Sequence, residues 1–212
     1  MPEEFALGEA LPGGPVPPGS NVLVSGGRAT APRRVALSIL DAGFRTGEPA
    51  IVVSADRSAR QLGREYAESF GADPDPELFR VVNCSGTSAE SEYEREWVSS
   101  PGDLTGIGMG VVKAGRDIAA ADPTRVAVLS LSTILQYGSL DRTFSFTHVL
   151  SGRIAAEDRL GVFTLDPTTH EERAVNSLTS LFDRVCELRE RDGTREARVV
   201  GGPRGATAWK PF

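Results

Sequence analysis

Short apolar runs alternate with segments of helical apolar spacing along most of the chain. Apolar runs of strand length, bounded by polar or turn residues, predict buried strands at residues 22–24, 50–54, 79–83, 125–131 and 160–165. Between them, apolar residues recur every third or fourth position, which predicts helices after residue 32 and at 58–70, 103–121, 140–156 and 169–182. Buried strands separated by helices are typical of an α/β fold with a mostly parallel sheet and helices on both faces.

The two ends of the chain differ from this pattern. Residues 1–20 are rich in Gly and Pro and have no periodicity, so we expect an extended N-terminal arm. Residues 184–201 alternate across an Asp192-Gly193 turn and predict a C-terminal antiparallel hairpin at the edge of the sheet. Residues 21–212 are therefore predicted to form a single domain.

One internal segment, residues 84–103, is polar and acidic without a sustained period. Such a composition favours a solvated surface loop. The alternative is a segment that becomes ordered against a partner, which the aromatic residues Tyr93 and Trp97 among the charges would suit.

Composition indicates a soluble globular protein. The 212 residues suffice for one sizeable core, and the hydrophobic and charged fractions of 40% and 25% are ordinary. No apolar run has the length of a membrane span, and the first residues do not form a signal peptide, so we expect a cytoplasmic location without membrane contact.

Charge argues against nucleic acid as a partner. The formal net charge is −6, whereas non-specific binding to a phosphate backbone depends on clustered Lys and Arg. Lys113 and Lys210 are the only lysines, so the positive charge is almost entirely arginine. An acidic, arginine-rich chain of this kind suits a high-GC or salt-adapted organism, such as a haloarchaeon.

The metal-ligating residue types are few and scattered. Cys84 and Cys186 are far apart and read as buried free thiols in a reducing compartment. His148 and His170 are the only histidines and do not complete a cluster with them, so no metal site is expected.

The stretch NVLVSGGRATAPRRVALSIL, residues 21–40, carries the strongest functional pattern. A strand, a glycine turn and a helix follow one another, as in a phosphate-binding loop. When G-x-x-x-x-G-K-[ST] is set on Gly26, the sixth position is Ala31, the lysine position is Pro32 and the hydroxyl position is Arg33. The layout is kept while the residues that bind phosphate and Mg²⁺ are absent, and an ordinary strand-to-helix turn is the alternative interpretation.

We therefore treat this loop as a degenerate nucleotide-binding loop, comprising Gly26, Gly27, Arg28, Pro32 and Arg33. Pro32 suits the first turn of a helix, but it removes one amide from any phosphate cradle. The arginines of the helix start could bind an anion; the alternatives are a solvated basic turn or one paired with a partner's acid. Two further carboxylates, Asp56 and Asp166, end strands at the same edge, where turn chemistry is the competing role.

Taken in order, several stretches of residues 19–212 resemble the KaiC-like branch of the RecA-type ATPases. They are NVLVSGG, AIVVSADRSARQLGREYAESFG, DLTGIGMGVVKAG, VAVLSLSTILQY, GVFTLDPTTHEE and RVVGGPRGATAWKPF. The resemblance implies a three-layer RecA-like fold, ATP binding at subunit interfaces and assembly into rings or filaments.

The departures from that family fall on its functional positions. Its Walker A Lys and Thr correspond to Pro32 and Arg33, and its Walker B acid corresponds to Leu129. The remaining departures are Ala29 and Ala31 for two glycines, Asp56-Arg57 for paired glutamates, and Gly202 with Arg204 for a basic pair in the tail.

These losses predict a non-catalytic pseudo-ATPase that acts through protein contacts in signalling or regulation, with a protein partner or a second copy and without a cofactor. Phosphoryl transfer needs positioned cations and a group that orients water, and several are replaced together. The alternative is a nucleotide- or anion-binding switch without hydrolysis, which leaves ATP binding open. In that case Arg34, Asp56 and Arg204 are candidate anion or partner contacts. A DNA-associated recombinase relative is disfavoured by the charge.

Overall fold

The computed structural model describes residues 4–8, 11–87, 91–118, 123–202 and 205–212. Within them the chain forms a sheet of nine strands in the order β4-β3-β2-β5-β6-β1-β7-β8-β9. The strands are β1 (Asn21–Ser25), β2 (Ala50–Ser54), β3 (Phe79–Asn83), β4 (Glu94–Trp97), β5 (Arg125–Leu129), β6 (Leu160–Leu165), β7 (Arg184–Arg191), β8 (Thr194–Gly201) and β9 (Lys210–Pro211).

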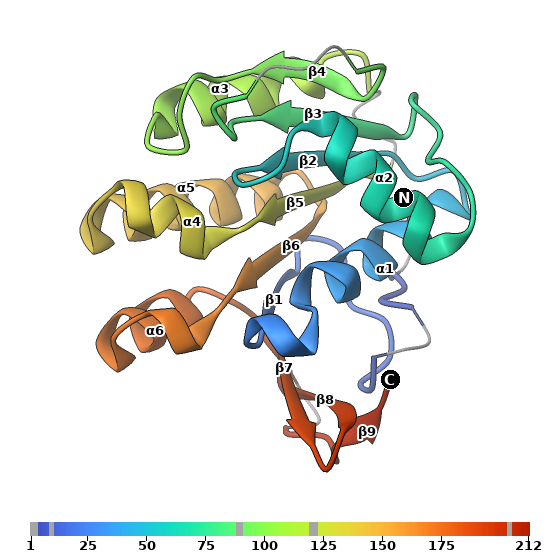
Figure 1. The fold of residues 1–212 in the computed structure, drawn as a ribbon, viewed down its shortest axis with the longest axis vertical. Coiled ribbons are helices and arrows are strands. Elements are labelled where there is room, and N and C mark those ends of the chain that lie inside the picture. The colour runs from blue at the N-terminus through green and yellow to red at the C-terminus, as the bar shows by residue number, and fades with distance from the viewer. Residues whose placement is uncertain (1–3, 9–10, 88–90, 119–122, 203–204) are drawn as a thin grey trace.

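Helices cover both faces of this sheet (Figure 1). They are α1 (Pro32–Phe44), α2 (Ala59–Phe70), α3 (Leu104–Ala114), α4 (Leu131–Tyr137), α5 (Leu140–Ala156) and α6 (Glu172–Thr179), with 3₁₀ turns at η1 (Arg28–Thr30) and η2 (Pro167–Thr169). One buried cluster joins α1 and α2 to the sheet, and a second joins α3, α4, α5 and α6 to its other face. The predicted three-layer α/β architecture is confirmed.

The strand pairing explains why the five predicted strands read as continuous apolar runs. β1, β2, β3, β5 and β6 pair in parallel with their neighbours, and helices cover the sheet on both sides. The hairpin predicted across Asp192-Gly193 is present, with β7 antiparallel to β8. Its first strand also pairs in parallel with β1, so the hairpin extends the parallel sheet directly beside the first strand.

Local capping fixes the helix ends. Ser58 and Gln61 form a capping box at the start of α2, and Gly71 ends this helix in the left-handed conformation with φ 82°. Asp103 accepts a hydrogen bond of 2.8 Å from the Gly106 amide at the start of α3. That helix ends at Ala114, earlier than predicted, while residues 119–121 of the predicted helix lie outside the described part of the chain.

The N-terminal segment packs on the domain and does not extend away from it as an arm. Phe5 and Val16 exchange two backbone hydrogen bonds of 2.7 and 2.9 Å. Their side chains are buried in the core together with Leu7 and Leu11. These isolated apolar residues are spaced too irregularly to show a period, so the sequence pattern did not reveal their burial.

The predicted surface loop at 84–103 contains β4, which pairs in parallel with β3. Preceding β4, Tyr93 is buried and packs against Gly63 of α2, where any added Cβ would collide with its ring. The loop prediction is therefore wrong for Glu94–Trp97, because a charged edge strand carries no apolar run. Residues 88–90 of this segment lie outside the described part.

Candidate functional site

A cavity of about 490 Å³ lies at the carboxyl ends of the central strands. The segments that follow β1, β2, β5 and β6 contribute its lining, together with the second turn of α2. Its charged lining residues are Arg28, Arg33, Arg34, Asp56, Arg57, Glu65 and Asp166. The structure thus brings the predicted loop and the two strand-end carboxylates to one place, where ligands bind in open parallel sheets.

Hydrogen bonds within the turn use the backbone donors of the loop after β1. In η1 the Thr30 amide donates to the Gly27 carbonyl at 2.9 Å, and the Ala31 amide donates to the Arg28 carbonyl at 3.2 Å. The Thr30 hydroxyl donates to the Gly27 carbonyl as well, at 2.7 Å. Pro32 then occupies the first turn of α1 and has no amide to donate. These donors are used inside the turn or are missing, so they do not point at a ligand.

Gly26 is required by packing. A Cβ at this position would collide with the Thr30 hydroxyl and lie 2.8 Å from Leu188 Cβ. The glycine therefore lets the loop pass under β7, a role that needs no phosphate. At Gly27 the nearest atom to an added Cβ is Thr168 Cγ2 at 3.3 Å, a tight but less severe contact.

Arg33 forms ion pairs with two carboxylates inside the cavity. Its Nη2 donates to Asp56 Oδ2 at the end of β2, and its Nη1 donates to Glu65 Oε2 of α2 at 3.2 Å. The three side chains are 18%, 31% and 32% exposed. These ion pairs thus join α1, the turn after β2 and α2 within the cavity.

The other charged lining residues are three arginines and one carboxylate. Arg28 and Arg34 are exposed at its rim, and Arg57 is half-buried. Asp166 accepts hydrogen bonds from the amide and hydroxyl of Thr168, and one of its oxygens lies 3.9 Å from the Cβ position of Gly27. A carboxylate this close to the loop repels an anion there.

The end of β5 carries no carboxylate. Leu129 is fully buried in the core beneath the cavity. Ser130 caps α4, and Ser132 accepts a hydrogen bond of 2.9 Å from the Asp166 amide, which ties the ends of β5 and β6 together. The hydroxyls of this segment therefore form hydrogen bonds with backbone groups.

The other predicted residues do not join this cavity. Arg204 lies outside the described residues, so the structure does not place this candidate contact. Gly202, at the neighbouring position of the tail, packs next to Arg184, whose Nε would lie 3.1 Å from an added Cβ. In the described ranges no three His, Cys, Asp or Glu side chains are grouped as a metal site requires.

Burial keeps the two cysteines protonated. It raises the pKa of the Cys84 thiol to about 12, with the nearby Asp56 carboxylate adding to the effect, and raises the pKa of Cys186 to about 12 as well, with Glu187 adding to it. Neither thiol is a nucleophile at neutral pH, because only the thiolate reacts.

Sequence reasoning missed Glu65, and it named Arg57 only as a departure from the family and not as a site residue. Glu65 lies 32 residues after Arg33 and meets it only because α2 packs beside α1, so no spacing in the sequence marks the pair. Arg57 lies next to Asp56, and its carbonyl accepts a hydrogen bond of 2.7 Å from Ser54, which fixes the turn after β2.

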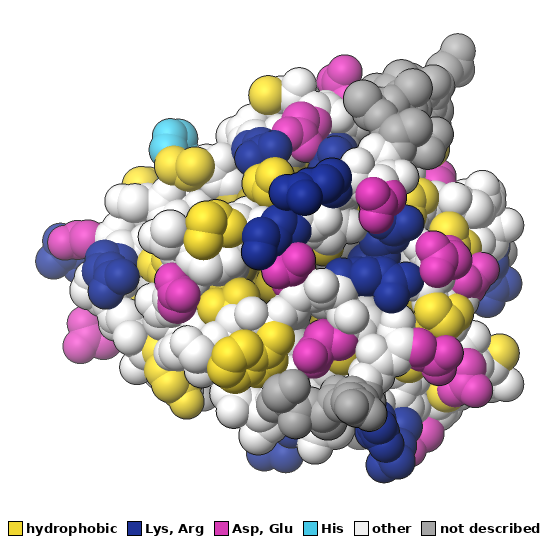
Figure 2. Space-filling view, turned by 90° about the horizontal axis from the view of Figure 1, so that it is seen from above, with side chains coloured by type: hydrophobic (Ala, Val, Ile, Leu, Met, Phe, Trp, Pro, Cys, Tyr) yellow, Lys and Arg dark blue, Asp and Glu magenta, His cyan; other side chains and the backbone are white. Residues whose placement is uncertain are grey.

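On the face shown in Figure 2, Lys and Arg side chains are interspersed with Asp and Glu. This arrangement differs from the continuous basic surface that follows a nucleic-acid backbone. None of the helices in the described ranges combines the length and apolar character needed to cross a bilayer.

Comparisons with known proteins identify a family, a curated relative and a solved structure. The model for the "Family of unknown function (DUF7504)" matches residues 19–188. The UPF0273 protein MK0039 of Methanopyrus kandleri is 29% identical over 172 residues, which cover 72% of this chain and 66% of that protein. This chain thus spans just under two thirds of that curated relative.

A solved structure, the KaiC-like protein PH0186 from the hyperthermophilic archaeon Pyrococcus horikoshii OT3, superposes with a TM-score of 0.70 at 18% identity. The match covers 98% of this chain and 94% of that one. Both relatives are archaeal. The chain belongs to the DUF7504 family of unknown function, and its fold is the RecA-like fold of a KaiC-like protein.

Proposed function

We propose that this chain is a non-catalytic RecA-like domain, a pseudo-ATPase that works through protein contacts in regulation or signalling. The observation that carries the proposal is the ion-paired Arg33, which lies where a phosphate-binding loop has the hydroxyl ligand of Mg²⁺. To bind Mg-triphosphate, the site would have to break the contacts of Arg33 with two carboxylates and then place those carboxylates beside phosphate oxygens.

The backbone supports the same conclusion. Phosphate loops bind through amides that converge on the ligand and through a lysine. Here the Thr30 and Ala31 amides are bonded within the turn, and Pro32 offers neither an amide nor a cation. Leu129 replaces the acid that would hold Mg²⁺ through water. Several elements of phosphoryl transfer are absent together, and each contributes several kcal/mol in active enzymes.

Thermal unfolding with and without Mg-ATP tests the proposal. A ligand at a hundred times its Kd stabilises a protein by about 2.7 kcal/mol, which for a chain of this size raises the Tm by about 5–10 °C. We expect no shift at millimolar Mg-ATP and no phosphate release above the rate without protein. A Mg²⁺-dependent shift of several degrees would remove the proposal.

A nucleotide- or anion-responsive switch without hydrolysis is the second candidate. It is favoured by Arg28 and Arg34, which stand at the rim of the cavity and form no ion pair within the described residues. In this case phosphate or nucleotide binds measurably, and Arg33→Ala abolishes the affinity. Affinity that is present and unchanged in Arg33→Ala would show that these residues are wrongly assigned.

A further inference from the structure

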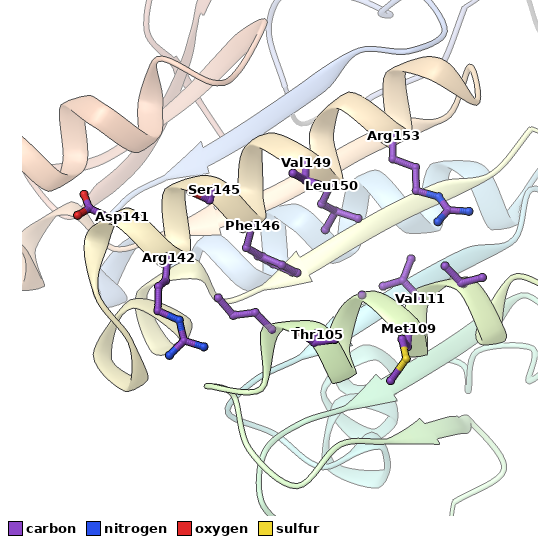
Figure 3. Close-up of a pocket in the computed structure, with 13 residues that line it drawn as sticks. Thr105, Met109, Val111, Asp141, Arg142, Ser145, Phe146, Val149, Leu150 and Arg153 are labelled. Carbon is purple, nitrogen blue, oxygen red and sulfur yellow. The ribbon is translucent and has the colours of Figure 1, made fainter.

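A second and larger cavity lies between α3 and α5, on the opposite side of the sheet from α1. It is a groove of about 740 Å³ (Figure 3). Phe146 and Leu150 extend into it from α5, and Met109 and Val111 line it from α3. The groove is separate from the cavity at the carboxyl ends of the strands, with which it shares no lining residue.

The walls of this groove are apolar and open to solvent. The side chains of Met109, Val112 and Val149 are 56%, 40% and 70% exposed, and they are half of the six large exposed hydrophobic residues in the described ranges. Pockets for small molecules bury most of the ligand surface, which walls as exposed as these do not. An exposed apolar patch of this kind is instead typical of a surface that binds another macromolecule.

Gly108 lines the groove in the middle of α3, although the packing of its own chain does not require a glycine there. At the other two glycines of this helix, Gly106 and Gly110, an added Cβ would collide with another side chain. At Gly108 it would meet no atom within 4 Å outside its own part of the helix. Glycine inside a helix is unfavourable relative to alanine, because it loses more backbone entropy on folding. A second backbone that approaches α3 at this point would explain the glycine.

An arginine reaches toward α3 at each end of the groove. Arg142 and Arg153 both extend from α5 to the groove side, whereas Asp141 points away from it (Figure 3). Arg142 forms no ion pair within the described residues. The two arginines are eleven residues apart, which is just over three helical turns. They therefore lie on the same side of α5, about 16 Å apart along its axis.

The Arg153 end of the groove keeps a positive charge. Arg153 donates from Nε to Glu157 at 2.8 Å, and Arg159 contacts the same carboxylate at 3.1 Å. Two guanidinium groups share one carboxylate, so one positive charge remains, and the terminal nitrogens of Arg153 can donate to a further acceptor. Both ends of the groove therefore attract acidic groups, although the net charge of the whole chain is −6.

We propose that the groove binds an acidic amphipathic helix of a protein partner. The helix lies between α3 and α5, with its apolar side on Phe146, Leu150 and Val111, and its backbone comes close to α3 at Gly108. Positions i and i+11 of an α-helix face the same side, so two acids at this spacing meet the two arginines of α5. Apolar residues at i+3, i+4 and i+7 lie between these acids on the same face and fill the groove.

Fluorescence anisotropy with two designed helical peptides tests the proposal on the intact chain. The acidic probe carries two glutamates eleven positions apart, with leucines three, four and seven positions after the first of them. The lysine probe has lysines in place of both glutamates and is otherwise identical. We expect the acidic probe to bind at least about tenfold more tightly than the lysine probe, and added salt should reduce this difference.

Charge reversal identifies the two arginines as the contacts. Arg142→Glu and Arg153→Glu should each weaken binding of the acidic probe about tenfold, because each replaces an attraction with a repulsion. The double variant Arg142→Glu/Arg153→Glu should prefer the lysine probe, a reversal that a loss of folding could not produce. Arg64→Glu is the matched control, since it reverses an exposed arginine of α2 on the other face of the sheet, and it should bind like the wild type.

Gly108→Leu tests the close approach to α3 separately from the charges. The Tm of this variant should not fall, because the free chain has open space at the Cβ position. Its affinity for the acidic probe should fall about tenfold, since the leucine side chain occupies the place of the bound helix. Unchanged affinity would contradict the proposed position of the helix.

Two results with the peptides overturn the inference: equal binding of both probes, or no binding of the acidic probe at millimolar concentration. Phosphatidylglycerol vesicles that bind the wild type and not Arg142→Glu would assign the groove to a membrane surface instead. Dimers in sedimentation equilibrium that the same reversals dissociate would assign it to a second copy. The inference does not rest on the proposed function, because binding of Mg-ATP would remove the pseudo-ATPase and leave the groove, whereas failure of the probes would do the opposite.

Discussion

Two arginines, Arg33 and Arg125, pair with carboxylates in different parts of the molecule. Arg125 is completely buried, donates to Glu48 at 2.7 Å and bonds the carbonyls of Ala6 and Ile39. Burial lowers its pKa, and Glu48 opposes that effect. Arg33 instead lies in a cavity with its two carboxylates about one-third exposed. Ion pairing thus joins the N-terminal segment to the core in one region and lies within the candidate site in the other.

The comparison distinguishes an arginine that stabilises the fold from one that lines the candidate site. Arg125 links four segments of the chain, so its substitution should lower the free energy of unfolding of the whole domain. Arg33 links only side chains around a cavity, so its loss should lower the free energy of unfolding less than the loss of Arg125 does. The predictions below begin with the largest expected effect.

Arg125→Met should lower the free energy of unfolding by about 3–5 kcal/mol, because it removes a completely buried ion pair partner and leaves Glu48, whose side chain is only 12% exposed, without a counter-charge. Urea denaturation measures the loss. The double variant Arg125→Met/Glu48→Gln should recover part of it by removing the unpaired charge. A loss below about 1 kcal/mol in the single variant would show that Arg125 is not structural.

Thiol labelling compares the carboxyl edge of the sheet, near Arg33, with the interior of β7. Cys84 follows β3 at the carboxyl edge, and Cys186 lies within β7. With a pKa of about 12 in place of 9.0, each thiolate is populated about a thousandfold less at pH 8 than in the unfolded chain. A chromogenic disulfide reagent should therefore react with both thiols only after denaturation.

The same shifts give a pH dependence. The thiols stay protonated to higher pH in the folded state, so their contribution to stability is complete below pH 9 and is lost as pH rises toward 12.

In the labelling experiment, rapid reaction of Cys84 alone in the native protein would contradict the prediction. It would show that the carboxyl edge of the sheet opens, although ion pairs link the elements there.

Gly26→Ala should destabilise the protein by about 1–3 kcal/mol, because its methyl group would overlap Thr30 and Leu188. Gly27→Ala is the matched control and should cost less, since its nearest contact is 3.3 Å away. Chemical denaturation measures both. Equal small losses of stability in the two variants would mean that packing does not require Gly26. The glycine would then be interpreted as a remnant of a phosphate-binding loop.

Arg33→Met should change stability by about 1 kcal/mol or less, because its ion pairs are partly exposed and screened. The comparison with Arg125→Met uses the same substitution in both regions. A loss of unfolding free energy as large as that expected for Arg125→Met would show that Arg33 stabilises the fold. Its ion pairs would then no longer support the proposed function.

The sequence predicted the parts of the fold in which local pattern and burial agree. The buried strands at Ala50–Ser54 and Phe79–Asn83, the helix Leu140–Ala156 and the C-terminal hairpin appear with the expected limits, because each has a clear period or turn. The edge strand Glu94–Trp97 has neither, since charged side chains occupy it. The helix Leu131–Tyr137 is too short to show a period.

The site was predictable in position and not in its contacts. Strand, glycine turn and helix placed Pro32 at the carboxyl edge with Asp56, and both line the cavity, while Gly26 directly follows β1. The pairing of Arg33 with Glu65 depends on the packing of α2 beside α1, and the burial of Phe5 and Val16 depends on the N-terminal segment folding back. Such tertiary contacts leave no periodic signal in one sequence.

Direct calorimetric titration of the intact chain with Mg-ATP tests the central claim, which is that ion pairs and a closed turn occupy the site. The account predicts only the heat of dilution at millimolar nucleotide, for the wild type and for Arg33→Met alike. A saturable heat with one nucleotide per chain, lost without Mg²⁺, would contradict it.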